Sequence, residues 1–296
     1  MSDQRQGGIA WTEETWNPVR GCSRVSRGCE RCYAERQAGR MAGPGGAYEG
    51  LVRPARGGFR WTGTVSPVLD GGRTLTAPLR WLRPRRVFVN SMSDLFHEAL
   101  SDEAIADVFA VMAAATRHQF QVLTKRAARM REWAARQGGS GWPPPNVWLG
   151  VSVEDQASAE GRLPHLLATP AAVRWISYEP ALGPVDFRPW LGQAPGVDWL
   201  VVGGESGPGA RPCDVAWIRS AIRQCQGAGT PVFCKQLGAL PYDLGGDSLS
   251  DDGTPPVGTL LDGICDRKGG DPSEWPEDLR IREMPAVGAT GTARRA

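Results

Sequence analysis

Three cysteines, Cys22, Cys29 and Cys32, lie within eleven residues near the start of the chain. Thiolates bind metals, and in a reducing compartment a tight cysteine cluster is typical of a metal or catalytic site rather than of disulfides. A structural zinc site normally has four protein ligands, whereas three thiolates leave one coordination position unfilled. This spacing therefore favours an open metal centre, where chemistry can take place.

The spacing of the cysteines also bears on the choice between zinc and iron–sulfur. Cys29 and Cys32 form a Cys-x-x-Cys pair, which suits either. Cys22 adds a third ligand but no second pair of the kind that a zinc ribbon has. A [4Fe–4S] cluster can use three thiolates and keep one iron for a small molecule, and Gly21 and Gly28 would let the backbone wrap closely around it. The residues therefore favour iron–sulfur over zinc, with a purely structural role as a third interpretation.

Composition limits the class of protein. The chain has 296 residues, of which 41% are apolar, which suits one large α/β domain with appendages or at most two domains. It lacks an apolar run of the roughly 18 residues that a membrane helix needs, and it lacks a signal segment, so we expect a cytoplasmic protein without a membrane partner. The formal charge of +2 does not by itself require a nucleic-acid partner. Arginines cluster at 53–60, 80–86 and 126–136, either as solvated faces or as phosphate-binding sites.

From residue 87 onward, short apolar runs alternate with segments of helical periodicity. The runs are rich in β-branched and aromatic residues and cover 87–89, 120–123, 147–151, 173–176, 199–202 and 231–234. Near-continuous apolar runs of this length are typical of strands that are covered on both faces of a parallel sheet. Apolar residues at helical spacing in 105–112 and 218–225 predict helices between them. The alternation indicates βα units with right-handed crossovers.

The number of strands decides whether a barrel closes. Two weaker candidates, 8–11 and 62–68, would raise the total to eight, as in a closed (β/α)8 barrel, whereas six strands would leave it open. We therefore predict an α/β fold, a (βα) barrel of TIM type, full or partial, over residues 1–240. The Gly- and Pro-rich stretch 42–58 reads as a loop, and residues 241–296 are expected to form an irregular C-terminal extension.

Polar residues follow almost every predicted strand. Ligands bind at the carboxyl ends of strands in such barrels, so these residues should meet at one mouth together with the cysteine loop. The expected set is Ser91, Ser93, Asp94, Thr124, Lys125, Ser152, Glu154, Asp155, Ser177, Glu179, Glu205, Ser206, Lys235 and Gln236. Asp94, Asp155 and Ser206 also suit helix N-caps. Glu179 and Glu205 are poorer caps, and a charge at a barrel mouth needs a partner.

Several segments together resemble the phage-associated gene-product thirty-seven/sixty-eight family, a group of largely uncharacterised proteins. The resemblance covers about residues 9 to 240. The segments that carry it are Trp16-Asn17-Pro18 with the cysteine run through Glu35, and residues 88–96, 122–126, 148–154 and 203–207.

More remotely, the cysteine loop resembles that of radical S-adenosylmethionine enzymes. Those enzymes combine three cysteines after the first strand with a partial or full (βα) barrel. Here six residues rather than three separate the first two cysteines, Tyr33 follows the last cysteine instead of preceding it, and the glycine-rich motif expected after the second candidate strand is replaced by residues 66–68.

This resemblance implies a [4Fe–4S] cluster on Cys22, Cys29 and Cys32, with S-adenosyl-L-methionine bound at the fourth iron and cleaved to a 5′-deoxyadenosyl radical. It implies an electron donor such as flavodoxin or ferredoxin, and a nucleotide or nucleic acid is the expected substrate class. Lys125, Lys235, Glu179 and Glu205 are the candidate catalytic residues. The candidate cofactor-binding residues are Ser91, Ser93, Asp94, Ser152, Glu154, Ser206 and Gln236.

Two alternatives remain open at this point. The first is a zinc-stabilised, phage-type nucleic-acid-binding protein without catalysis, which needs a fourth ligand such as Cys213, Cys265 or His97. The second is a metal-free hydrolase that uses the carboxylates of the mouth and leaves the cysteines without a role.

Overall fold

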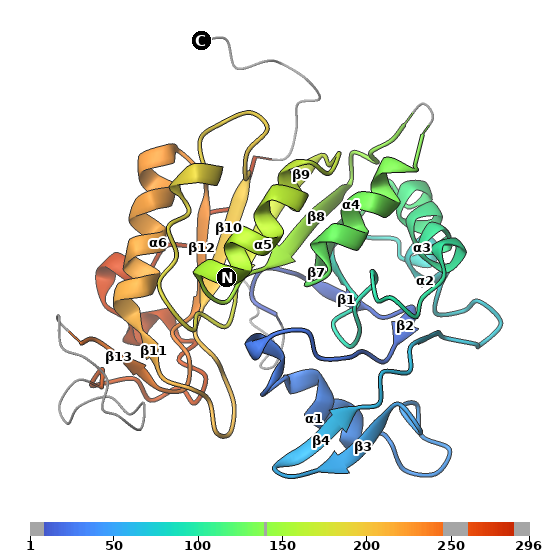
Figure 1. The fold of residues 1–296 in the computed structure, drawn as a ribbon, viewed down its shortest axis with the longest axis horizontal. Coiled ribbons are helices and arrows are strands. Elements are labelled where there is room, and N and C mark those ends of the chain that lie inside the picture. The colour runs from blue at the N-terminus through green and yellow to red at the C-terminus, as the bar shows by residue number, and fades with distance from the viewer. Residues whose placement is uncertain (1–8, 139–140, 245–259, 287–296) are drawn as a thin grey trace.

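The central element is a seven-stranded parallel sheet that curls into a half-barrel (Figure 1). The computed structural model describes residues 9–138, 141–244 and 260–286. In spatial order the strands are β1 (Glu14–Trp16), β6 (Arg86–Val89), β7 (Gln119–Thr124), β8 (Val147–Ser152), β9 (Val173–Tyr178), β10 (Trp199–Gly203) and β12 (Val232–Gln236). The two edge strands, β1 and β12, do not pair with each other in the described sheet, so the barrel is partial.

The six strands predicted after residue 87 are confirmed, and the two weaker candidates are wrong. Residues 9–11 of the first candidate form a turn, and Gly8 lies outside the described residues. The first strand is instead β1, which has one buried side chain, Trp16, and pairs with β6 from Glu14 onward. Within 62–68, only Ser66–Pro67 (β5) is a strand, and it pairs antiparallel with β2 (Val19–Arg20) outside the main sheet. The closed eight-stranded barrel therefore does not form.

Helices cover the outer face of the sheet, with α4, α5 and α6 in front of it in Figure 1. They are α2 (Ala77–Arg80), α3 (Asp102–Ala114), α4 (Ala127–Ala135), α5 (Gln156–Leu167) and α6 (Val215–Ala228), with the short 3-10 helix η2 (Arg188–Trp190) before β10. Ser101 caps α3 and Asp155 caps α5 through a capping box, whereas Gly229 ends α6 in the left-handed conformation. The main apolar core lies between these helices and the sheet.

The inner face of the half-barrel carries a second apolar cluster, here called the tryptophan floor: Trp11, Phe88, Trp148, Trp175, Trp199, Val201 and Phe233. The ring centroids of Trp175 and Trp199 lie 5.5 Å apart, and those of Trp11 and Trp175 lie 5.1 Å apart. Gly150 leaves room for Trp175, because a Cβ at this glycine would come within 2.4 Å of the indole. The inward positions nearer the carboxyl ends of β8 and β9 are the small residues Ser152 and Ser177. Space is therefore left above the floor.

Residues 17–85 form an N-terminal insertion beside the half-barrel. It contains η1 (Arg27–Cys29), α1 (Tyr33–Arg40) and a hairpin of β3 (Val52–Ala55) and β4 (Gly58–Trp61). The loop expected over 42–58 is thus partly a strand, with its turn at residues 56–57. The hairpin packs on α1 through a small apolar cluster that includes Ala34, Ala38 and Trp61.

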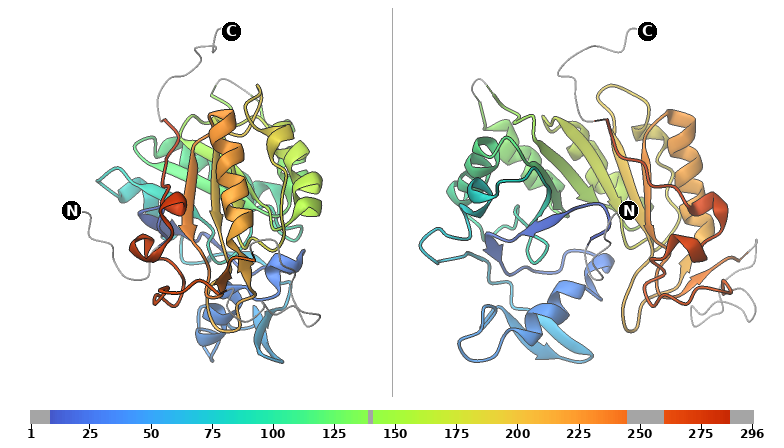
Figure 2. Two further views of the ribbon diagram at one scale, coloured as in Figure 1. Left: turned by 90° about the vertical axis from the view of Figure 1, so that its left-hand side faces the viewer. Right: turned by 180° about the vertical axis from the view of Figure 1, so that it is seen from behind.

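The described part of the predicted C-terminal extension lies against the sheet. After β11 (Cys213–Asp214) and its partner β13 (Pro241–Tyr242), residues 260–286 contain η3 (Pro272–Glu274) and η4 (Glu277–Leu279). Residues 281–284, here called the strap, run beside the edge strand β12: the Cys234 amide donates to Ile281 O and the Glu283 amide to Val232 O, at 2.8 and 2.9 Å. Trp199 Nε1 also donates to Glu283 O at 2.9 Å. Seen from behind, the red segment that contains the strap lies on this side of the half-barrel (Figure 2). Residues 245–259 and 287–296 lie outside the described residues.

No helix in the described ranges is long and apolar enough to cross a bilayer.

Candidate functional site

A cavity of about 270 Å³ opens at the carboxyl edge of the sheet, above the tryptophan floor. The three cysteines line it together with groups from the ends of six strands. Of the residues predicted to bind metal, cofactor or substrate, it brings together Cys22, Cys29, Cys32, Ser91, Ser93, Asp94, Lys125, Ser152, Glu179, Glu205, Ser206, Lys235 and Gln236. Glu154 is the exception and does not line the cavity.

The cysteine loop is fixed between β2 and α1. Gly21, with φ 91°, bridges to Ser93, and a Cβ here would lie 2.0 Å from Thr64 O, so the turn requires glycine. Cys29 ends η1, and Cys32 directly precedes α1. The Tyr33 hydroxyl donates to Ser91 O at 2.8 Å and so joins α1 to the loop after β6. This loop, residues 90–94, follows the second strand of the sheet, and it is not glycine-rich either.

Arg126, which sequence reasoning left out of the site, organises the wall beside Cys22. This buried guanidinium donates to Asp94 Oδ2 at 3.1 Å and to Glu98 Oε2 at 2.7 Å. It also donates to Ser23 Oγ at 2.8 Å and lies 4.0 Å from Cys22 Sγ. A fixed cation beside the thiol would stabilise its thiolate form. Arg126 directly follows the strand predicted over 120–123, so its position near the site could be expected. The sequence does not show in which direction its side chain points.

Two of the three thiols, those of Cys22 and Cys32, resist ionisation. Burial raises the pKa of Cys22 to about 12, the charge of Asp94 adds to this, and Arg126 opposes it. Burial also raises the pKa of Cys32. Because thiolates are the metal-binding form, loading a metal centre here must release protons.

Glu154 lies beneath the cysteine loop rather than at the mouth. Its side chain is 1% exposed. It accepts from Lys125 Nζ at 3.0 Å, Arg162 Nη1 at 2.9 Å and Ser26 Oγ at 3.0 Å. Burial alone would raise the pKa of Glu154, but the charges of Lys125 and Arg162 more than offset it and hold the pKa below its usual range. This carboxylate therefore ties the cysteine loop to β8.

The two glutamates expected at the mouth both have cationic partners. Glu179 pairs with Lys235 at 2.9 Å, with Ser177 Oγ 3.4 Å from its second oxygen. Arg211 donates hydrogen bonds to both carboxylate oxygens of Glu205, at 2.6 and 3.0 Å. Its Nη1 also donates to Arg27 O at 2.9 Å. Glu205 is thereby occupied in anchoring the cysteine loop.

The predicted polar ligands differ in how far they are already engaged. Ser91 Oγ donates to Asn17 Oδ1 at 3.1 Å, Ser93 Oγ to Val19 O at 3.0 Å, and Gln236 Nε2 to Gly204 O at 2.9 Å. Asp94 accepts from Thr124 Oγ1 at 2.7 Å as well as from Arg126. The side chains of Ser152 and Ser206 form no hydrogen bond to other described residues, so their hydroxyls are available to a ligand.

Asn90 is a second residue that sequence reasoning missed. It lines the cavity, is 3% exposed, and has φ 60°, which is unusual for a residue other than glycine. Neither atom of its side-chain amide has a hydrogen-bond partner among the described residues. A buried amide without partners costs about 1–3 kcal/mol per group, so a ligand that satisfied it would bind more tightly.

Comparison with known proteins gives one match. The profile of a family described as a protein of unknown function, DUF5131, matches residues 6–268. The chain belongs to this DUF5131 family. Membership in an uncharacterised family, as predicted from the sequence motifs, is thus confirmed, and the match extends beyond residue 240. Neither the curated proteins nor the solved structures gave a match.

The fourth ligands considered for a zinc site in this DUF5131 protein do not reach the cysteines. None of Cys213, Cys265 and His97 lines the cavity. Both nitrogens of His97 are engaged, Nε2 with Ser23 Oγ at 2.8 Å and Nδ1 with the Ala99 amide at 3.1 Å. Across the described ranges, no group of three or more His, Cys, Asp or Glu side chains is placed to hold a single metal ion.

Proposed function

We propose that this chain is a radical S-adenosylmethionine-type enzyme whose [4Fe–4S] cluster binds to Cys22, Cys29 and Cys32. The observation that carries the proposal is the shared cavity: all three cysteines line it together with Glu179, Lys235 and the ends of six strands. The remote resemblance of the cysteine loop to that enzyme class supports the same conclusion. An electron donor such as flavodoxin or ferredoxin would supply reducing equivalents, and a phage-associated role would follow from the resemblance to the gene-product thirty-seven/sixty-eight family.

The donor set fits a cluster better than a single ion. Three thiols are present, and a fourth Cys or His is absent from the described cavity lining. Thiolates bound to different irons of a cluster lie further apart than thiolates that share one ion, so a cluster does not need the compact donor group that a single ion needs. The unpartnered amide of Asn90 and the free hydroxyls of Ser152 and Ser206 offer hydrogen bonds to a polar ligand beside the cysteines.

When bound, such a cluster with S-adenosyl-L-methionine on its fourth iron supplies a 5′-deoxyadenosyl radical that abstracts a substrate hydrogen. The protein's own residues would orient the reactants and exclude water. Lys235 and Glu179 present a cation and an anion side by side, a pairing that suits an amino or carboxylate group. Lys125 is held by Glu154 through one contact and keeps further N–H donors for a ligand carboxylate. The tryptophan floor closes the cavity from below with apolar surface.

Anaerobic reconstitution followed by iron and sulfide analysis tests this proposal. The wild-type chain should hold about four irons and give 5′-deoxyadenosine with S-adenosyl-L-methionine and dithionite. A Cys22→Ala/Cys29→Ala/Cys32→Ala variant should lose both, whereas Cys225→Ala, which removes a buried thiol of the helix–sheet core, should keep the iron. Stoichiometric zinc in active wild-type protein would refute the proposal and favour the zinc-stabilised alternative.

A further inference from the structure

Positive charge is concentrated in the N-terminal insertion. Residues 20–85 contain thirteen arginines and four acidic residues, whereas the formal charge of the whole chain is only +2. All four acidic groups are already engaged. Glu35 pairs with Arg24 and Glu30 with Arg211. Asp70 accepts from Thr74, and Glu49 accepts from the Gly45 amide. The near-neutral total therefore hides a strongly basic segment next to the cysteine cavity.

The β3–β4 hairpin carries the clearest part of this charge. Arg53 and Arg60 are directly opposite each other across the two strands, and Arg56 lies in the turn. All three are exposed, and none forms an ion pair with a described residue. Like charges directly opposite each other destabilise a hairpin. An anion bound to this face would relieve that repulsion.

The hairpin packs against the cavity wall through Trp61, on the face opposite Arg60, because neighbouring residues of a strand point to opposite sides. Trp61, the residue after Arg60, lines the cavity and packs on α1. Arg31 also lines it, is exposed, and has no ion pair among the described residues. Tyr33 lines the same cavity with 49% of its surface exposed, while its hydroxyl is held by Ser91 O. A fixed, half-exposed aromatic ring beside a free guanidinium suits a nucleobase and its phosphate.

We propose that Arg53, Arg56 and Arg60 bind the backbone of a single-stranded nucleic acid, and that Tyr33 stacks one of its bases at the mouth of the cysteine cavity. This names the substrate class of the enzyme proposed above and rests on that proposal. Guanidinium forks match phosphate oxygens, and the phosphate contacts supply affinity without reading sequence.

Two observations favour a single strand over other polyanions. The candidate chemistry lies inside a cavity rather than on the surface, and a base must leave its stack before chemistry on it can occur, so a single strand reaches the site more readily than a duplex. Among the described residues, none of the large exposed apolar side chains lies in the hairpin, so it lacks the residues that would insert into an anionic membrane.

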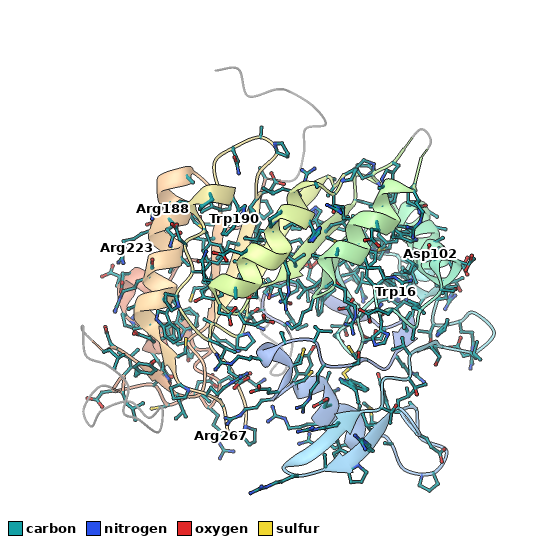
Figure 3. The ribbon with its side chains drawn as sticks, in the orientation of Figure 1. Trp16, Asp102, Arg188, Trp190, Arg223 and Arg267 are labelled. Atoms are coloured by element: carbon teal, nitrogen blue, oxygen red, sulfur yellow. The ribbon has the colours of Figure 1, made fainter. Side chains whose placement is uncertain are left out.

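Fluorescence anisotropy with a labelled single-stranded oligodeoxynucleotide of mixed sequence, over a range of salt concentrations, tests the inference. Arg53→Ala/Arg56→Ala/Arg60→Ala should weaken binding and flatten the plot of log K against log salt by about 2, at about 0.7 for each of three lost phosphate contacts. The matched control is Arg117→Ala/Arg131→Ala/Arg223→Ala, which removes the same charge from exposed positions outside the insertion; Arg223, on α6, is far from the hairpin (Figure 3). Tyr33→Ala should weaken binding about fivefold or more, and Tyr33→Phe should not.

The readout separates this inference from the proposed function. The triple cysteine variant carries no cluster but keeps the hairpin, so it should still bind the oligonucleotide with the wild-type salt dependence. If the wild-type protein binds the oligonucleotide but holds no iron after reconstitution, the nucleic-acid inference stands and the iron–sulfur proposal fails. Equal losses in the two arginine variants would overturn the inference. Tighter binding to acidic phospholipid vesicles or to duplex DNA than to the single strand would overturn it as well.

Discussion

Replacing Glu154 is the most informative single change in the scaffold of the site. Its buried carboxylate accepts hydrogen bonds from Lys125, Arg162 and Ser26, and the side chains of the two cations are only 18% and 11% exposed. Glu154→Ala leaves both cations without their shared partner and frees the cysteine loop at Ser26. Breaking a buried ion pair by removing one partner costs about 3–5 kcal/mol. We expect the free energy of unfolding to fall by that amount.

Two further variants sharpen this prediction. Glu154→Gln keeps a side-chain oxygen as acceptor but loses the charge, and should cost about 2 kcal/mol. Glu160→Ala is the control, because Glu160 lies exposed on α5, the helix that also carries Arg162, and should change stability by less than about 0.5 kcal/mol.

Urea denaturation followed by tryptophan fluorescence measures all three, and iron content after reconstitution reports on the cysteine loop. A Glu154→Ala variant as stable as Glu160→Ala would refute the view that this carboxylate anchors the loop. If Glu154→Ala loses stability but keeps its full iron content, the carboxylate stabilises the sheet and is not needed to position the cysteine loop.

Three further predictions concern the scaffold. Gly150→Ala should destabilise the protein by about 1–3 kcal/mol, since its Cβ would meet the Trp175 ring at 2.4 Å. Gly161→Ala, on α5 in open space, should stabilise the protein by about 1 kcal/mol. Urea denaturation compares the two variants. Ser101→Ala removes the N-cap of α3, which accepts from the Ala104 amide, and should lower stability by about 1 kcal/mol in the same assay. Burial lowers the pKa of His118 below its ordinary 6.5, so the unfolded chain binds the proton more readily than the folded one. The free energy of unfolding should therefore fall as the pH drops below about 6.5. The dependence of this free energy on pH should be shallower in His118→Gln.

Much of the half-barrel was predictable because its strands are buried on both faces. Runs such as 199–202 are apolar throughout, and each of the last six strands carries this signal. β1 does not, since Glu14 and Thr15 are not buried and only Trp16 enters the core. The run 62–68 has β-branched residues but belongs to the insertion. Short edge strands take their structure from their neighbours, and a local pattern cannot reveal that.

The candidate site was predictable in position but not in its internal bonds. The topology of parallel strands brings their carboxyl ends together, so Ser152, Glu179 and Lys235 were expected near the cysteines. The pairing of Glu205 with Arg211 and the burial of Glu154 depend on how the loops fold back, which no spacing encodes. Asn90 was missed because an unpartnered amide is visible only when its surroundings are known.

Trp199 contacts two segments that are synthesised at different times, one around Trp11 and one in the strap. Trp11 packs edge-on against Trp175 and Trp199 near one end of the chain, and Trp199 donates to Glu283 near the other. During synthesis this flank of the half-barrel therefore stays uncovered until residues 281–284 have left the ribosome. Removing Trp11 or deleting the strap should therefore expose the same flank of the half-barrel.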